Sequence, residues 1–441
     1  MRKSLFSLLA LVIVIALALS ACGTPATEAP TEAPATEAPV VEATEAPAVV
    51  TEAPVATEAA TEVVATEAPA EEFVFGILLV GAANDHGWSQ AHYEAGLYVE
   101  QNVPGTRMIY LENVYSGSPA YPGTTTSQLA EQLLSQGAKL IIFNSDDMKD
   151  EATIFTQAHP EVPVIMASGD QVWEEGEAYI PMENMVNVMG RMEYGKMMAG
   201  CAAALTSQTG KIGYLGPLIN DETRRLTASA YLGAKYCWEQ AGKNPADLSF
   251  KVTWIGFWFY IPGVSSDPTQ VADDFFNSGY DVVISGIDTT EAMTEAKRLS
   301  DAGQAVWAIP YDFKGACDQA PEICLGVPYF NWGPSYVEWI QKAVNGEFST
   351  AFQWLAPDWT DINNPDTSAV GFVKGPALSE ESAATLDTFI TELAGGLNLW
   401  TGPLNLQDGT PFLADGEVAT DQQVLYLKQL LEGMEGQSVA E

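Results

Sequence analysis

Short apolar runs alternate with helix-like patterns along this chain from Phe73 onward. Strands are predicted at eight apolar runs, namely 74–80, 107–111, 139–143, 163–167, 211–215, 249–256, 281–285 and 305–309. Helices are predicted at 88–101, 124–136, 150–158, 193–206, 223–241, 268–278 and 289–302, with another at 379–395 that Ser379 opens. The alternation predicts an α/β fold with parallel sheets and right-handed crossovers.

The pattern also repeats within the chain. The stretches QGAKLIIF (136–143) and SGYDVVIS (278–285) both combine a helix end, a glycine and a buried strand, and a polar loop follows each. So many strands fit two sheets of similar topology better than one. We therefore expect two Rossmann-like lobes around a cleft, an N-terminal lobe of 73–186 plus 307–350 and a C-terminal lobe and tail of 187–306 plus 351–441. A hinge is expected where the chain crosses between them, near 184–189 and 305–309.

The loop after the first apolar run has the content of a small-molecule pocket. In open α/β sheets ligands lie outside the carboxyl ends of the strands, where residues 81–87 are expected. This loop and the helix start supply a carboxylate (Asp85) and a large aromatic wall (Trp88). A capped turn explains the same residues equally well, with Asp85 or Ser89 as the cap and Trp88 in the core.

The first 72 residues indicate that the protein is exported, and none of them is a candidate catalytic residue. Residues 1–22 form a basic start, an apolar run and the sequence Leu19-Ser20-Ala21-Cys22, which is typical of a signal peptide with a bacterial lipobox. Acylation of Cys22 would anchor the chain to the cell membrane on its extracytoplasmic face. Residues 23–72 repeat the motif TEAP and contain no Lys or Arg, so a disordered tether is expected.

Charge and cysteine usage narrow the possible partners. The chain has 58 acidic and 19 basic residues, a formal charge of −39, which disfavours nucleic acid as a partner. Six residues separate Cys317 from Cys324, and the export context permits a disulfide between them. Cys201 and Cys237 fit buried thiols in helices. With three histidines and no paired CxxC or CxxH motif, no metal site is expected.

Four stretches of the chain carry distinctive patterns. The opening loop and helix read D-x-G-W-x-x-x-H-x-x-x-G (85–96). The others are TGKIGY (209–214) with Glu222 and Gly233, NWGP (331–334), and a tail with TGPL (401–404), DG (408–409) and Gly416. Together these stretches resemble the basic membrane protein (Bmp) family of ABC-importer substrate-binding lipoproteins, which includes purine nucleoside receptors. Against the nucleoside-receptor pattern, His86 replaces the usual lysine and Trp88-Ser89 replaces Phe-Asn, so the exact ligand does not follow.

The resemblance implies a periplasmic-binding-protein type I fold that closes on a hinge. It implies capture of a purine nucleoside or nucleobase in the interdomain cleft and delivery to the permease subunits of an ABC importer, by a monomer without a cofactor. A receptor for a sugar or another small polar solute on the same fold is the alternative. An exported hydrolase with paired cleft carboxylates is a further alternative, although no GxSxG, HExxH, Walker or GxGxxG motif is present and no catalytic residue is assigned.

The resemblance also implies which side chains face the ligand. Trp88 and Trp258 are the expected base-stacking aromatics, and core packing is the alternative for Trp258. Asp312 is the expected partner of ribose hydroxyls, and Lys314 is a candidate donor. Trp332 would either close the pocket edge or pack under the 317–324 loop. The remaining expected ligand-binding residues, most of them in strand-end loops, are Asp85, Ser89, Ser145, Asp146 and Asp288.

Overall fold

The computed structural model describes residues 72–440. The predicted signal peptide, the lipidation site Cys22 and the tether up to residue 71 lie outside these residues. Within the described part, no helix has the length and apolar character that a membrane span requires.

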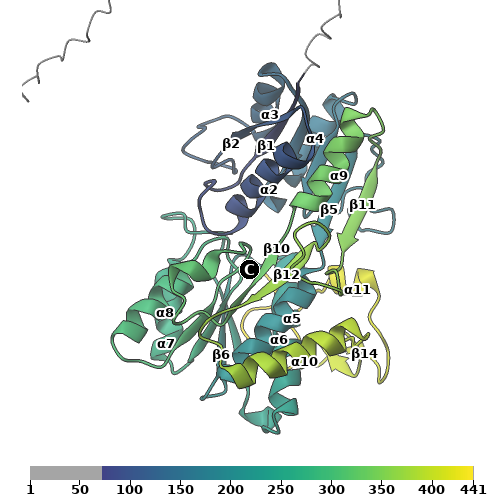
Figure 1. The fold of residues 1–441 in the computed structure, drawn as a ribbon. Coiled ribbons are helices and arrows are strands. Elements are labelled where there is room, and N and C mark those ends of the chain that lie inside the picture. Colours follow the sequence, from purple (N-terminus) through teal and green to yellow (C-terminus); the bar gives the residue numbers. More distant parts are fainter. Residues whose placement is uncertain (1–71, 441) are drawn as a thin grey trace, which may run out of the picture. The chain divides into compact units, whose positions relative to one another are not determined.

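A six-stranded parallel sheet forms the first lobe. Its strand order is β11-β5-β4-β3-β1-β2. The strands are β1 (Phe73–Leu78), β2 (Thr106–Leu111), β3 (Ala138–Phe143), β4 (Val164–Ala167), β5 (Met185–Gly190) and β11 (Ala351–Leu355). Its helices are α2 (Trp88–Asn102), α3 (Thr126–Ser135), α4 (Lys149–Ala158) and α9 (Gly333–Val344), and α2 and α9 lie side by side (Figure 1).

A five-stranded parallel sheet forms the second lobe. Its strand order is β15-β7-β6-β8-β9. The strands are β6 (Lys211–Gly216), β7 (Ser249–Trp254), β8 (Val282–Ser285), β9 (Trp307–Ile309) and β15 (Met434–Glu435). Its helices are α5 (Met192–Thr206), α6 (Asp221–Gln240), α7 (Pro268–Asn277), α8 (Glu291–Asp301) and α10 (Glu380–Ala394).

Apolar burial explains why these segments form the sheets. The central strands β1, β3, β4, β6 and β8 are almost entirely buried, as strands covered by helices on both faces must be. Helices α5 and α6 cross so closely that a Cβ on Gly200 would lie 1.8 Å from the Ala230 carbonyl oxygen. A disulfide joins the same two helices through Cys201 and Cys237, which the sequence suggested to be buried thiols.

An antiparallel ribbon connects the lobes. It consists of β10 (Gly326–Phe330) and β12 (Val370–Lys374), which pair along their full length. Within the ribbon, Phe330 belongs to the apolar core of the first lobe, whereas Val327 and Phe372 pack into cores of the second. Together with the β5–α5 connection, the ribbon carries every passage of the described chain between the two sheets.

The sheets differ from the expected lobe boundaries at three places. Residues 187–190 complete β5 in the first sheet, and β11 pairs with β5 although residues 351–355 were expected in the C-terminal lobe. Conversely, β9 pairs with β8 in the second sheet, although residues 307–309 were expected in the N-terminal lobe. Hydrogen bonding between parallel strands decides these memberships, and a single strand's sequence does not reveal its partner.

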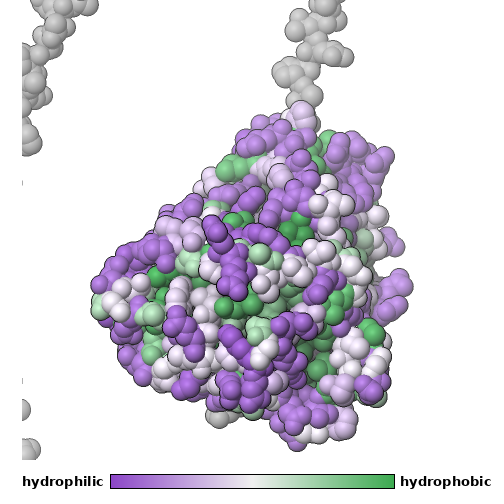
Figure 2. All heavy atoms as spheres, turned by 60° about the horizontal axis from the view of Figure 1, so that its bottom comes forward, coloured by the Kyte–Doolittle hydropathy of each residue, from purple (hydrophilic) through white to green (hydrophobic). Residues whose placement is uncertain are grey.

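The second disulfide and the C-terminal tail complete the fold. Cys317 and Cys324 are bonded, with an S–S distance of 2.03 Å. The tail contains β13 (Leu404–Asn405), β14 (Pro411–Leu413) and α11 (Asp421–Leu425), and it ends in β15 at the edge of the second sheet. On the face shown in Figure 2 hydrophilic side chains predominate, as the net charge of −39 leads us to expect.

Candidate functional site

A small cavity of about 20 Å³ lies between the lobes, which is room for about one water molecule. A larger ligand would enter only when the lobes move apart. The first lobe contributes Trp88, Ser145, Asp146 and Ser168 to its wall, and the second contributes Tyr214, Pro217, Glu222, Thr223, Leu226, Trp258, Gly286, Asp288 and Tyr311. Most of these residues lie in loops after the strands, at the carboxyl ends where the fold type places ligands.

Asp85 organises the loop after β1. Its carboxylate accepts hydrogen bonds from the backbone N–H groups of Gly87, Ser89 and Gln90 at 2.9–3.0 Å. The Ser89 hydroxyl is fully buried and accepts the Gly81 N–H at 2.8 Å. Both side chains therefore fix the start of α2, as the capped-turn interpretation predicts, and neither lines the cavity.

Trp88 both packs in the core of the first lobe and lines the cavity, the two roles that the sequence left open. Its indole N–H donates to the Asn144 carbonyl oxygen at 2.6 Å, and its ring packs edge-on against Phe330 and Trp332. The ring also forms part of the cavity wall, although only 7% of the residue is exposed. The packing holds one aromatic face in a fixed position, which a stacking wall for a flat ligand requires.

The lobes are in close contact at Gly87. A Cβ at this position would lie 1.7 Å from the carbonyl oxygen of Asp288, so only glycine fits. The neighbouring Trp88 N–H points at the same oxygen at 3.4 Å. Asp288, held in the cavity wall by an N–H bond to the Trp258 carbonyl oxygen, therefore lies beside the aromatic wall of the opposite lobe.

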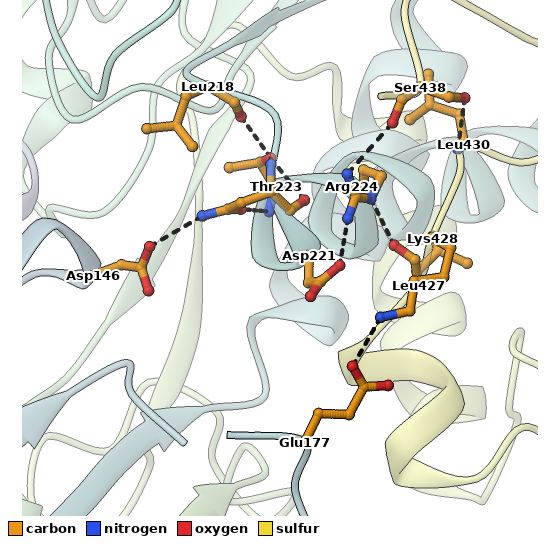
Figure 3. Close-up of polar contacts among 11 residues, drawn as sticks. Asp146, Glu177, Leu218, Asp221, Thr223, Arg224, Leu427, Lys428, Leu430 and Ser438 are labelled. Atoms are coloured by element: carbon orange, nitrogen blue, oxygen red, sulfur yellow. Dashed lines mark hydrogen bonds and ion pairs between the residues drawn. The ribbon is translucent and has the colours of Figure 1, made fainter. Parts of the chain in front are cut away.

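Ser145 and Asp146 lie in the wall at the end of β3. The Ser145 hydroxyl accepts the Asp147 N–H at 3.3 Å and caps a short 3₁₀ turn, Asp146–Met148. Asp146 forms an ion pair with Lys149 at 3.2 Å. It also accepts a hydrogen bond from Asn220 of the second lobe at 3.3 Å (Figure 3). The cavity is thus bounded on this side by a polar contact between the lobes.

The second lobe supplies three aromatic wall residues, Tyr214, Trp258 and Tyr311. Trp258 is 9% exposed and lies in the loop that follows β7. Burial raises the pKa of Tyr311 well above its ordinary value, with the carboxylates of Asp312 and Glu222 adding to the effect, so its hydroxyl keeps its proton. Flat apolar surfaces from both lobes therefore face one cavity.

Asp312 is completely buried behind Tyr311 and does not line the cavity. Its backbone has a φ of +70°, which is uncommon for a residue other than glycine, and both carboxyl oxygens lack hydrogen-bond partners in the described part of the chain. Burial raises its pKa well above the ordinary value, while nearby Lys196 opposes the shift. A buried carboxyl without partners favours its neutral form.

Lys196 is the buried cation behind the same wall. Its ammonium donates to the Ser285 carbonyl oxygen at 2.8 Å and lies 3.0 Å from the centre of the Tyr311 ring. Burial lowers its pKa well below the ordinary value, and Asp312 works against that shift. Lys196 thus supports the position of Tyr311 from behind and does not contact the cavity.

Two residues expected at the ligand lie elsewhere. Trp332 is buried under Trp88, where it stacks on His92 with ring centres 4.4 Å apart. Lys314 is exposed, with its ammonium 5.5 Å from the centre of the Tyr329 ring. Neither residue lines the cavity. Trp332 instead packs into the aromatic core of the first lobe, against Trp88, His92 and Phe330.

Several wall residues were not predicted from the sequence as ligand-binding residues. Ser168 and Glu222 follow the carboxyl ends of β4 and β6, and that position is a signal that could have found them. Tyr214 lies inside β6 and Tyr311 looks like part of an apolar run, so neither differs in sequence from an ordinary core residue. In the described part of the chain, no group of His, Cys, Asp and Glu side chains could hold a metal ion.

A second, more polar cavity of about 260 Å³ adjoins the first. Asp146, Ser168 and Glu222 line both cavities, and Lys149, Arg225 and Tyr426 line only the second. Tyr426 belongs to the C-terminal tail, and its hydroxyl donates to Asp170 at 2.6 Å. This cavity is therefore bounded by both lobes and by the tail.

The tail is bonded to both lobes around this second cavity. Arg224 of α6 donates to the Leu427 carbonyl oxygen at 2.6 Å, and Lys428 pairs with Glu177 of the first lobe at 3.1 Å (Figure 3). The Glu177 N–H also donates to the Tyr426 hydroxyl at 2.8 Å. The tail consequently joins the two lobes on this side of the cleft.

Comparisons with known proteins agree with this architecture. Among solved structures, the chain is similar to an ABC transporter solute-binding protein from Aeropyrum pernix (TM-score 0.58, 12% identity, 76% of this chain and 93% of that one). It is also similar to one from Conexibacter woesei (TM-score 0.52, 15% identity, 74% and 98%). These likenesses show the fold, which is that of type I periplasmic binding proteins.

Sequence relatives point to the same class of protein. A purine-binding protein of Brucella abortus is 28% identical over 369 residues, 83% of this chain and 93% of that protein. A putative ABC transporter glucose-binding protein of Haloferax volcanii is 26% identical over 280 residues, 62% of each chain. The family described as ABC transporter substrate-binding protein PnrA-like, Bmp, matches residues 73–381. The chain therefore belongs to the Bmp family of substrate-binding proteins of ABC transporters, which are extracytoplasmic solute receptors and not enzymes.

Proposed function

We propose that this protein is a lipid-anchored receptor that captures a purine nucleoside or nucleobase between its lobes and delivers it to an ABC permease. The observation that carries the proposal is the shared cavity wall, to which the first lobe contributes Trp88 and the second Trp258. A flat heterocycle between two aromatic side chains gains about 0.5–1.5 kcal/mol per stacked pair beyond the burial of its area. The purine-binding relative supports the same ligand class.

The polar part of the wall fits a ligand rich in hydrogen-bond donors. Three carboxyl groups line the cavity, those of Asp146, Glu222 and Asp288, and no Lys or Arg does. Ring N–H, amino and hydroxyl groups suit such a wall, whereas phosphate groups would be repelled by it. The ligand is therefore expected to be uncharged or cationic, which favours nucleosides and bases over nucleotides.

A sugar is the second candidate ligand. The carboxyl-rich wall suits hydroxyl donors too, and one relative is a putative glucose-binding protein. Titration calorimetry with adenosine, guanosine, inosine, the free bases and glucose separates the candidates. Binding of at least one purine compound and not of glucose is expected, and binding of glucose alone would replace the purine assignment while leaving the receptor role intact.

Closure of the two lobes over the ligand is part of the proposal. In the part of the chain that the structure describes, the backbone passes between the two sheets through the β5–α5 connection and the β10–β12 ribbon. Polar bonds of the tail and the Asp146–Asn220 contact also bridge the lobes. Such a fold typically opens and closes as two rigid bodies about its crossings. The β10–β12 ribbon and the residues around Gly190 are the proposed hinge.

We expect the ligand to make the protein more compact. Small-angle scattering from a chain that begins near Glu71 should give a smaller radius of gyration with a bound purine than without one. The Trp88→Ala variant serves as the control: at a ligand concentration a few times the dissociation constant of the parent, it should stay close to the ligand-free value. An unchanged radius in the parent protein, under conditions where calorimetry shows saturation, would contradict ligand-driven closure.

The membrane anchor rests on the first 22 residues. The basic start, the apolar run and Leu19-Ser20-Ala21-Cys22 motivate acylation of Cys22, and the tether would let a monomeric receptor reach its permease. Cys22→Ser should move the protein from the membrane fraction to the soluble fraction in the producing cell. Ser20→Thr is a nearby conservative control that should leave the protein at the membrane. Unchanged fractionation of Cys22→Ser, with no acyl mass on the N-terminal peptide, would contradict the anchor.

A further inference from the structure

Glu222 lies where the two cavities meet. It is the second residue of α6, which Asn220 caps, and it lines both the aromatic cavity and the polar one. The residue is partly buried, and its carboxyl group forms no hydrogen bond or ion pair within residues 72–440. An acid held this way has its hydrogen-bonding capacity free for a ligand.

The two cationic side chains that line the polar cavity with Glu222 are already paired with other acids. Arg225, on the same helix, is bonded to Glu193 of α5 at 2.7 Å, and Lys149 of α4 is paired with Asp146. Five further titratable groups, in the cavity wall or behind it, also interact electrostatically with Glu222, namely Asp288, Asp312, Tyr214, Tyr311 and Lys196. The pKa of Glu222 is raised to about 7, chiefly by burial. Arg225 opposes this rise in pKa, and the carboxylates of Asp146 and Glu193 add to it.

We propose that Glu222 binds the ligand as a neutral carboxylic acid and selects a purine edge that presents one donor beside one acceptor. The inference rests on the purine assignment above. The acid O–H donates to the ligand's acceptor while its C=O accepts from the neighbouring N–H. Adenine offers N6–H beside N1, and hypoxanthine offers N1–H beside O6, so both compounds match the same group.

Proton uptake on binding follows from this geometry. Wherever Glu222 is ionised in the free protein, the complex has to take up a proton, so affinity falls as pH rises. For one such group, the dissociation constant should rise about tenfold from pH 6 to pH 8, and binding at pH 7 should take up about half a proton. Asp288 also has a raised pKa, so the pH dependence must be assigned by substitution.

The test uses the full chain and calorimetric titration with adenine and hypoxanthine at pH 6, 7 and 8. Titrations at pH 7 in two buffers with different ionisation enthalpies give the number of protons taken up. Glu222→Gln keeps a donor and an acceptor at the same place but cannot titrate. Glu239→Gln makes the same chemical change at an exposed position near the other end of α6 and is the matched control. Thermal unfolding of each variant reports whether it is folded.

In the parent and in Glu239→Gln, we expect the tenfold loss of affinity and the proton uptake. In Glu222→Gln, we expect an affinity at pH 8 close to that of the parent at pH 6, with no proton uptake. Constant parent affinity between pH 6 and 8, or an unchanged pH dependence in a folded Glu222→Gln variant, would overturn the role of Glu222 while leaving the receptor assignment standing. If the parent binds no purine compound at any pH, the proposed function and this inference both fall.

Discussion

Trp88→Ala is expected to weaken the binding of purine nucleosides and free bases alike, by about 2 kcal/mol or about thirtyfold. The indole ring is both a wall of the cavity and part of a packed cluster with Phe330 and Trp332. Its loss removes the stacking face and opens a space that water can enter. Because the base is common to both kinds of ligand, the loss should be nearly the same for each.

The same substitution should also lower stability, and this effect needs a control. Removing a buried Trp side chain costs about 3–5 kcal/mol of unfolding free energy. Trp339 lies in α9, outside the cavity, and is 2% exposed. Its indole N–H donates a hydrogen bond to the Gln353 side chain. Trp339→Ala should therefore destabilise the protein to a similar degree with no change in ligand affinity. Ligand affinities are measured by titration calorimetry below the unfolding temperature of both variants. Equal affinities for Trp88→Ala and the parent would show that Trp88 does not contact the ligand.

Asp312→Asn is expected to weaken the binding of nucleosides by about 1.5–3 kcal/mol and to leave the binding of free bases unchanged. The residue has a strained backbone, two carboxyl oxygens without partners and a position directly behind the cavity residue Tyr311. Hydroxyl groups of a ribose are donors that could satisfy those oxygens once a bound ligand moves Tyr311. Two ribose hydroxyls donating to this carboxyl, with Lys196 nearby, would favour its ionised form in the complex. An asparagine keeps the shape but cannot ionise and offers one acceptor oxygen.

Folding and binding effects can be separated at this position. Because the Asp312 carboxyl makes no hydrogen bonds in the described structure, its replacement should cost little stability. Asp281 is a buried aspartate outside the cavity that accepts hydrogen bonds from Ser207, Gln208 and Thr209. Asp281→Asn should destabilise the protein and leave the affinities for adenosine and adenine unchanged. If Asp312→Asn binds both compounds as the parent does, Asp312 is a structural residue and not a ligand group.

Periodicity predicted most of the fold. The eight predicted strands correspond to β1–β4 and β6–β9, since continuous apolar runs are typical of parallel strands buried on both faces. β5 was not predicted, because the buried Asn187 interrupts its apolar run, and this side chain is bonded to Gln171 and to the Val172 N–H. β10 and β11 were not predicted either, because a proline interrupts the apolar run of β10 and a glutamine that of β11.

The site was predicted less completely than the fold. Strand-end positions led to Ser145, Asp146 and Asp288, and the family resemblance led to Trp88 and Trp258; all five line the cavity. The same reasoning placed Asp85 and Ser89 there, although helix capping explains both of them. The distinction depends on which N–H groups lie within reach of each oxygen, and only the folded backbone determines that. The role proposed for Glu222 requires the same information, because it depends on the carboxyl group having no partner in the described residues.

The identity of the captured ligand is the central question, and the most direct measurement is mass spectrometry of small molecules released from the purified protein by denaturation. A receptor for purines, purified under native conditions from its producing cell, should release a purine nucleoside or base in a ratio approaching one per chain. The Trp88→Ala variant, purified in parallel, should release far less of it. Recovery of a hexose in that ratio, with no purine above the level released by the variant, would contradict the account.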